Sequence, residues 1–267
     1  MQTYSQVKNK TPINNKIPNS FKNEAEALKG GCKILKLKNN ALTNCVIEER
    51  EHEGVYTQRA FYKRSVILNI YDRNGLGEFH KVTEFVIPSW YGRARISFED
   101  LIGDGRVFLI INDLEGAKGT GISQDLLTIF GWHNGRFVPI LIETTRYVEA
   151  FSAGNHTHEL KANYQFVGRG NANKLAILLD YTYELNAPKQ KLTRKLEWQN
   201  ELRWNEQNFS FYNEELEKRR LQIPKNQIES SISEVRLNLI KSMPTDLAPD
   251  SLWKTDITKL YTKWRRG

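Results

Sequence analysis

The chain has 267 residues and a formal net charge of +8, from 39 lysine and arginine residues against 31 acidic ones. Hydrophobic residues make up 39% of the chain and charged residues 26%, which excludes a protein that is disordered throughout. The longest apolar runs, 107–111 and 137–142, are too short to span a bilayer, and two cysteines without a Gly-X-Y period exclude disulfide-dense and fibrous classes.

The excess of basic residues favours an anionic partner: nucleic acid, acidic headgroups, cell-wall polymers or an acidic protein. These residues are scattered, however, and form only two small clusters, at 218–220 and 263–266. A nucleic-acid binder usually gathers its charge on one face and interleaves it with aromatic residues. The pattern therefore disfavours nucleic acid and is typical of a solvated basic surface.

Residues 1–28 have the composition of a flexible polar leader segment, rich in Asn, Lys, Gln, Ser and Thr with two prolines. The first five residues lack the apolar region of a secretory signal peptide. We expect either a cytosolic protein or a chain that begins after a removed leader. A polar segment of this kind is typical of the link between a leader and a folded periplasmic domain.

Cys32 and Cys45 are the only cysteines, and they flank two short strand-like stretches with an Asn39-Asn40 turn signal between them. A hairpin would bring the two sulfur atoms together. We predict a disulfide, which implies an oxidising compartment such as the periplasm or cell envelope. The alternative is a pair of unrelated buried thiols.

From residue 29 to 213 the chain is expected to be a β-repeat domain, because short runs rich in Val, Ile, Phe, Tyr and Thr alternate with Gly, Asn and Asp turns. The clearest turn signal is Asn134-Gly135. The predicted fold is mainly β, either propeller-like or built of multi-hairpin antiparallel sheets, with two C-terminal helices. Strands are expected at 32–38, 43–49, 55–71, 79–87, 94–99, 106–112, 124–131, 136–144, 146–151, 160–167, 174–184, 192–203 and 208–213.

The segment 214–267 changes character and is predicted to be helical and packed on the sheets. A capping box at Ser231 and Glu234 opens the first helix, which Pro244 ends. Asp250 and Ser251 can cap a second helix. Their apolar residues recur at helical spacing and indicate core-facing stripes rather than a ligand site: Ile232, Val235, Leu239 and Ile240 in the first, and Leu252, Ile257, Leu260, Tyr261 and Trp264 in the second.

Two stretches of the chain are similar to each other. Residues 100–113 can be aligned with 167–180, so that Gly103 matches Gly170, and Trp132 then matches Trp204. Each unit is predicted to contain four antiparallel strands, which is the description of a propeller blade.

The stretch Asp-Leu-Ile-Gly-Asp-Gly at 100–105 resembles the FG-GAP/VCBS repeat family, whose Asp-rich loops often bind Ca²⁺, and 72–77 looks like a degenerate copy. The resemblance covers roughly residues 60–213. It implies calcium ligands at Asp72, Asn74, Asp100 and Asp104. Against this, Ile102, Phe108, Val167 and Arg169 stand at ligand positions of the two aligned loops, whereas calcium needs six to eight oxygen atoms. The alternative is that the Asp and Asn residues satisfy backbone turns.

No signature of a known catalytic motif occurs, and we expect a protein that is not an enzyme. His156 and His158 share a strand face beside Glu159, but no third metal ligand is identifiable. The loops at 113–123, 152–159 and 184–191 are long, and binding residues usually lie on such loops. The predicted partner-binding residues are Trp90, Tyr91, Lys118, Asn155, His156 and His158; the two aromatic residues could equally seal the core.

The chain is similar in these features to bacterial periplasmic immunity proteins. That resemblance implies an inhibitor that blocks a secreted hydrolase or toxin by inserting loops into its cleft, with another protein as partner. The alternative is an envelope protein that binds carbohydrate or anions. Salt-sensitive binding to acidic glycans without a protein partner would favour that alternative.

Overall fold

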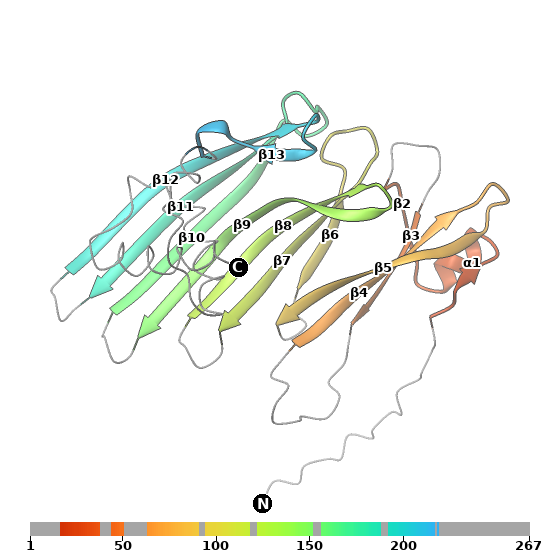
Figure 1. Cartoon of the computed structure of the whole chain (residues 1–267), viewed down its shortest axis with the longest axis horizontal. Helices are drawn as coiled ribbons and strands as arrows, with labels where there is room; N and C mark the ends of the chain where they lie inside the picture. The colour runs from red at the N-terminus through yellow and green to blue at the C-terminus, as the bar shows by residue number, and fades with distance from the viewer. Residues whose placement is uncertain are drawn as a thin grey trace, which may run out of the picture.

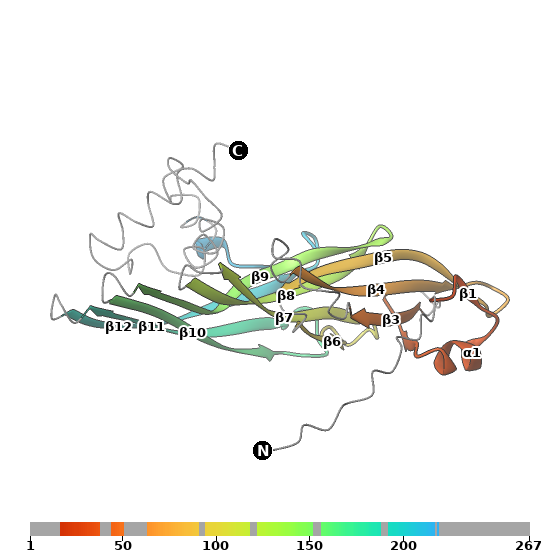
Figure 2. The ribbon, with the colours of Figure 1, turned by 90° about the horizontal axis from the view of Figure 1, so that it is seen from below.

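The computed structural model describes residues 17–37, 44–50, 63–90, 94–117, 122–151, 156–187, 192–216 and 218. These residues form two antiparallel sheets, one of five strands and one of eight, connected almost throughout by hairpins. The mainly β, multi-hairpin fold predicted from the sequence is confirmed. Figures 1 and 2 show an elongated molecule with the five-stranded sheet at one end and the eight-stranded sheet at the other.

The five-stranded sheet has the strand order β1-β5-β4-β3-β2. The alternating residues Val66, Leu68 and Ile70 of its central strand are all 0% exposed, as expected of a strand whose inward face lies in a core. Its strands are β1 (Ser20–Phe21), β2 (Lys33–Leu35), β3 (Asn44–Arg50), β4 (Lys63–Arg73) and β5 (Phe79–Trp90).

Part of the predicted leader is folded. A short helix, α1 (Glu24–Lys29), begins at Asn23, whose side-chain oxygen accepts a hydrogen bond from the backbone N–H of Glu26. Phe21 before it and Ala27 within it are buried in one cluster with the two cysteines. The prediction of a flexible segment up to residue 28 is therefore wrong for residues 17–28, because composition does not register a single cap and two buried side chains.

The eight-stranded sheet is a continuous meander with the order β13-β12-β11-β10-β9-β8-β7-β6. Asn134 and Gly135 form the predicted two-residue turn with positive φ angles of 49° and 79°. One strand, β9, replaces the two expected at 136–144 and 146–151. The strands are β6 (Arg95–Glu99), β7 (Phe108–Ala117), β8 (Ile122–His133), β9 (Arg136–Phe151), β10 (His156–Val167), β11 (Ala176–Ala187), β12 (Leu192–Asn205) and β13 (Ser210–Tyr212).

The two sheets pack together through an aromatic contact. The ring of Phe85 on β5 lies 5.0 Å from that of Phe130 and 5.2 Å from that of Phe137, on β8 and β9. These rings belong to a cluster that also contains residues of β3, β4 and β7. The outer face of the first half of the long sheet is thereby covered by the five-stranded sheet.

The long sheet bends in its middle. β9 pairs with β10 only over Arg146–Phe151, so the first part of β9 and the last part of β10 diverge. The two halves of the sheet then face one another across the largest core cluster, where the ring of Phe108 lies 5.6 Å from that of Trp204. At this end the loops after β6 and β10 touch, since Gly170 N donates to the carbonyl of Leu101 at 3.1 Å.

The predicted repeat holds for the order of elements but not for every matched residue. β6 to β9 and β10 to β13 each give four antiparallel strands with a glycine loop after the first. However, Trp132 packs in the cluster beneath the five-stranded sheet, whereas Trp204 packs inside the bend. In addition, β9 pairs with β10, so the two units are parts of one sheet rather than separate four-stranded blades.

The described chain ends in the first turn of a helix. Asn213 caps it, with its side-chain oxygen accepting from Leu216 N at 2.9 Å, and Leu216 is 3% exposed within the core of the bend. The two C-terminal helices predicted from the sequence lie outside the described residues.

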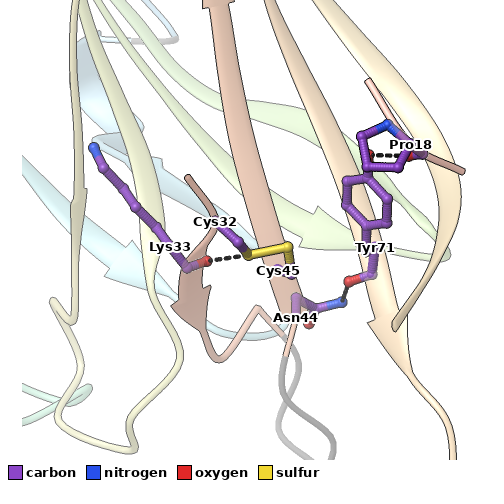
Figure 3. Close-up of a disulfide and its surroundings, with 6 residues drawn as sticks. All are labelled: Pro18, Cys32, Lys33, Asn44, Cys45 and Tyr71. Carbon is purple, nitrogen blue, oxygen red and sulfur yellow. Dashed lines mark hydrogen bonds between the residues drawn. A yellow bond between two sulfur atoms is a disulfide. The ribbon is translucent and has the colours of Figure 1, made fainter. Parts of the chain in front are cut away.

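Cys32 and Cys45 form a disulfide, with their Cα atoms 5.5 Å apart (Figure 3). Cys32 precedes β2 and Cys45 lies on β3, opposite Ile34, so the predicted hairpin brings them together. Both are buried, at 5% and 0% exposure. The carbonyl oxygen of Lys33 lies 3.5 Å from the Cys32 sulfur, which is a contact rather than a hydrogen bond because a disulfide sulfur carries no proton.

Tyr71 completes this core from β4, and its hydroxyl donates to the carbonyl of Pro18 at 2.7 Å (Figure 3). Burial, followed by the charges of Glu84 and Glu49, raises the pKa of Tyr71 to about 12. The pKa of Tyr71 in the folded protein lies above its unfolded value of 10.0, so its contribution to the free energy of unfolding is complete below pH 10. That contribution is lost as the pH rises towards about 12, because the tyrosine of the unfolded chain ionises first.

We expect Tyr71 to ionise near pH 12, and Tyr71→Phe to remove that step. The measurement is the ultraviolet absorbance of tyrosinate against pH in both proteins. A difference curve centred near the ordinary pKa would contradict the burial of this hydroxyl.

Candidate functional site

Three hairpin connections lie at one end of the long sheet. They join β7 to β8, β9 to β10 and β11 to β12, and alternate connections of an antiparallel meander lie on the same side. Figure 1 shows the paired ends of these strands in a row along one side of the sheet. The last cross-strand pairs are Ala117 with Ile122, Phe151 with His156, and Ala187 with Leu192. We call this side the hairpin end.

The connections are shorter than the sequence predicts. Residues 113–117, 156–159 and 184–187, expected in loops, are paired strand residues. They extend because they gain ladder hydrogen bonds from neighbouring strands, on one side for 113–117 and on both sides for 156–159 and 184–186. This is a long-range effect that local turn signals do not contain. The structure therefore brings the three predicted loop regions together at one end of the sheet. The paired strands continue up to each connection.

The predicted partner-binding residues are distributed between this end and β5. His156 and His158 are the first and third residues of β10, and His158 is paired to Glu149 and Leu185 in the backbone register. Lys118, Asn155 and Tyr91 lie outside the described residues. Trp90 is the last residue of β5, on the other sheet.

The outer face beside the hairpin end carries cross-strand charge pairs of both signs. Glu159 lies 4.0 Å from Arg146 on β9 and 3.1 Å from Lys161 on its own strand. Arg146 also faces Asp125, whose pKa is raised by burial and held back by the Arg146 and Arg95 charges. Charges of both signs arranged in this way can fix the orientation of a bound partner. Their contribution to binding affinity is smaller than their contribution to specificity.

The calcium candidates lie at two separate places, one in each sheet. Asp100 and Asp104 lie between β6 and β7, where Asp100 accepts from the backbone N–H groups of Gly103 and Gly105 at 2.6 and 2.8 Å. Asp104 accepts from both the backbone and the side chain of Arg106. These hydrogen bonds agree with the alternative interpretation, in which Asp side chains accept from the backbone N–H groups of a turn instead of binding calcium.

Asp72 is the next-to-last residue of β4 in the other sheet, and Asn74 lies in the turn between β4 and β5. Asp72 accepts from the side chain of Asn44, and the Asn74 oxygen accepts from the backbone of Leu76 and Glu78 at 2.9 and 3.0 Å. Within the described ranges, no three His, Cys, Asp or Glu side chains gather closely enough to hold a metal ion. Calcium binding stays a prediction, and the ion would have to compete with these donors.

We expect Asp100→Ala to lower the free energy of unfolding by about 1–3 kcal/mol, because it leaves two backbone N–H groups of a tight loop without their acceptor. Urea unfolding measures this loss. Asp100→Asn keeps one acceptor oxygen and should lose less. Equal stability of all three proteins would show that water replaces the carboxylate without loss.

One surface cleft among the described residues was not predicted. It lies over β12, β13 and the start of the last helix, with a volume of about 460 Å³. Tyr212, 37% exposed, offers an aromatic surface beside polar groups. The lining residues are Glu201, Arg203, Trp204, Asn205, Tyr212, Asn213, Glu214 and Glu215.

A buried polar group inside the bend was also missed. Glu143 on β9 is 1% exposed and accepts from the hydroxyl of Tyr181 at 3.3 Å. Tyr181 stacks on Trp198, with ring centroids 5.0 Å apart. In sequence Glu143 directly follows the apolar run 137–142, and a charged residue at such a position is expected on the solvent side.

No protein-family model, curated protein or solved structure matches this chain significantly. Among the described residues, none of the helices is both long enough and apolar enough to cross a bilayer.

Proposed function

We propose that this chain is a periplasmic or envelope binding protein of the immunity type, which blocks a secreted hydrolase or toxin by placing its hairpin end in the partner's cleft. One observation carries this proposal: three hairpin connections lie side by side at one end of a continuous sheet. The strand ends that flank these connections are held by the sheet, so they lose little freedom on binding.

Two further features support a role outside the cytoplasm with a protein partner. The buried disulfide is typical of an oxidising compartment. The net charge of +8 would accelerate association with an acidic partner.

The test is capture from a cell-envelope extract by the full chain, followed by assay of the captured protein's hydrolase activity with and without the chain. We expect inhibition, and a loss of capture by about tenfold or more in the double variant Lys118→Ala, Asn155→Ala. The control, Arg136→Ala, alters an exposed residue at the opposite end of the sheet. Recovery of no partner, together with hydrolytic activity of the chain itself, would reject the proposal.

The second candidate function is binding of an envelope carbohydrate or anion, and the cleft over β12 and β13 favours a carbohydrate. An exposed aromatic ring next to amide groups presents both an apolar surface and hydrogen-bond donors. Three of the lining residues are glutamates, and Arg203 is paired with one of them, Glu201, at 2.8 Å, so this cleft does not favour an acidic glycan. In this case Tyr212→Ala should abolish binding to a neutral glycan, and the Lys118 and Asn155 changes should have no effect.

A further inference from the structure

Three large apolar side chains are exposed on one hairpin of the five-stranded sheet. Leu76 in its turn is 86% exposed, and Val82 and Val86 on β5 are 49% and 50% exposed. Glu84 lies between the two valines, with 51% of its side chain exposed. Phe85 points the other way and packs on the long sheet, so the exposed side chains are not part of that contact.

The same stretch of β5 is an open strand edge. β5 pairs with β4 over its whole length, but on its other side only its first two residues pair with β1. The next bond on that side runs from Lys81 N to the carbonyl of Asn19, at 2.9 Å. At Pro18 the chain has left the edge, since its carbonyl accepts from the hydroxyl of Tyr71 on β4. Among the described residues, none pairs with this side of β5 beyond Lys81.

The register with β4 shows which backbone groups of this edge point outwards. In an antiparallel ladder, pairs that exchange hydrogen bonds alternate with pairs that do not. Lys81 donates outwards, so its pair with β4 is of the second kind. After a bulge at Val82, pairing resumes at Thr83 with the next residue of β4. The residues that direct their backbone groups outwards are therefore Glu84, Val86 and Pro88. Proline has no N–H group, and an outward position on an edge strand is where a sheet tolerates it.

We propose that this edge, residues 83–87, binds an extended segment of a partner protein, which adds an antiparallel strand to the sheet as β1 does at Phe79. The N–H and C=O groups of Glu84 and Val86 pair with its backbone. The Glu84 carbonyl accepts from the Thr83 hydroxyl at 3.4 Å, a long contact that an incoming N–H group replaces. This surface belongs to the other sheet from the hairpin end, so it does not rest on the function proposed there.

The exposed side chains define the chemistry of the added segment. Neighbours on one face of two paired strands interact directly, and apolar pairs and opposite charges are favourable there. The segment therefore carries a basic residue opposite Glu84, with an apolar residue two positions away on either side, facing Val82 and Val86. Glu84 already accepts from Lys81 on its own strand, and the basic residue of the partner joins this pair.

A second copy of this chain fits the edge less well. In a two-fold symmetric pair of β5 strands, the register that sets Val82 of one copy opposite Val86 of the other also sets Glu84 opposite Glu84. Like charges directly opposite one another are destabilising. A shift of the register by two residues places Glu84 opposite a valine and loses the apolar match. Charge therefore favours a different protein over self-association.

The test uses the isotope-labelled full chain and a capped peptide, Thr-Val-Thr-Lys-Thr-Val-Thr, which has the required pattern. We expect the peptide to shift the amide signals of Glu84 and Val86 and to slow their hydrogen exchange. Methylation of the peptide nitrogens of the lysine and one valine removes donors that face β5 and should weaken binding about tenfold. Methylation of the two threonines beside the lysine, whose N–H groups point away from β5, is the control and should change binding less than about twofold.

A matched pair of charge reversals tests the side-chain pattern. Glu84→Lys should weaken binding of the lysine peptide about fivefold and strengthen binding of the same peptide with glutamate in place of lysine. Glu49→Lys makes the same change at an exposed residue of the same sheet, on β3, away from this edge, and should leave both affinities unchanged. Equal effects of the two variants would contradict the proposed register.

Three further results would overturn the proposal. Slow exchange of the Glu84 and Val86 amides in the protein alone, at every concentration, would show that the chain covers its own edge. Protection that rises with protein concentration would show that a second copy does so. Unchanged amide signals at about 1 mM peptide would show that the edge does not take up a strand of this kind.

Discussion

Gly103→Ala is expected to lower the free energy of unfolding by about 2–5 kcal/mol, because the added methyl group has no room and the backbone is strained. Gly103 has a φ of +80°, and a Cβ there would lie 2.6 Å from the Cα of Gly170 and 2.7 Å from its carbonyl oxygen. Both are backbone atoms that cannot rotate away. To admit the methyl group, the loops after β6 and β10 must separate and loosen the bend of the sheet.

Gly170→Ala is the matched control. Gly170 has almost the same φ, +79°, but a Cβ there would have no atom within 4 Å. Gly170→Ala should lower the free energy of unfolding only by the cost of placing an alanine at a positive φ, about 1–2 kcal/mol. Urea unfolding of the two variants and the parent protein measures the difference. Equal losses would show that the close approach of the two loops is absent in solution.

The same pair of glycines shows how far sequence comparison reaches in this fold. Their match was predicted from two Gly-Asp/Asn turns, and such turns are local features that depend on few residues. The match of Trp132 with Trp204 fails because the ladders differ: Ile110 lies opposite Ile129, whereas its counterpart Ile177 lies opposite Leu202. The aligned strands are thus one residue out of register, and one residue reverses the face of every side chain.

The candidate site could be predicted only in outline. The sequence marked three loop regions as places for binding, and the meander places them at one end. That they are adjacent depends on which strands pair, and pairing between β9 and β10 leaves no local signal. Glu143 was missed for a related reason, since its burial results from the bend of the whole sheet.

Replacing both Cys32 and Cys45 by alanine is expected to lower the free energy of unfolding by about 3 kcal/mol, the usual effect of a disulfide that closes a loop of this size. The loss should begin locally. Phe21 and Ala27 bury their side chains in the cluster that surrounds the two cysteines. We therefore expect β1 and α1 to lose protection from hydrogen exchange before the rest of the molecule.

Chemical reduction of the parent protein separates the bond from the side chains. Reductant should destabilise the parent protein to about the level of the double-alanine variant and leave the variant unchanged. The hairpin end lies on the other sheet, so binding of a partner there should survive reduction, whereas a site that includes Trp90 on β5 should weaken. Mass spectrometry without reductant that finds two free thiols in the native protein would remove both the stabilising term and the argument for an oxidising compartment.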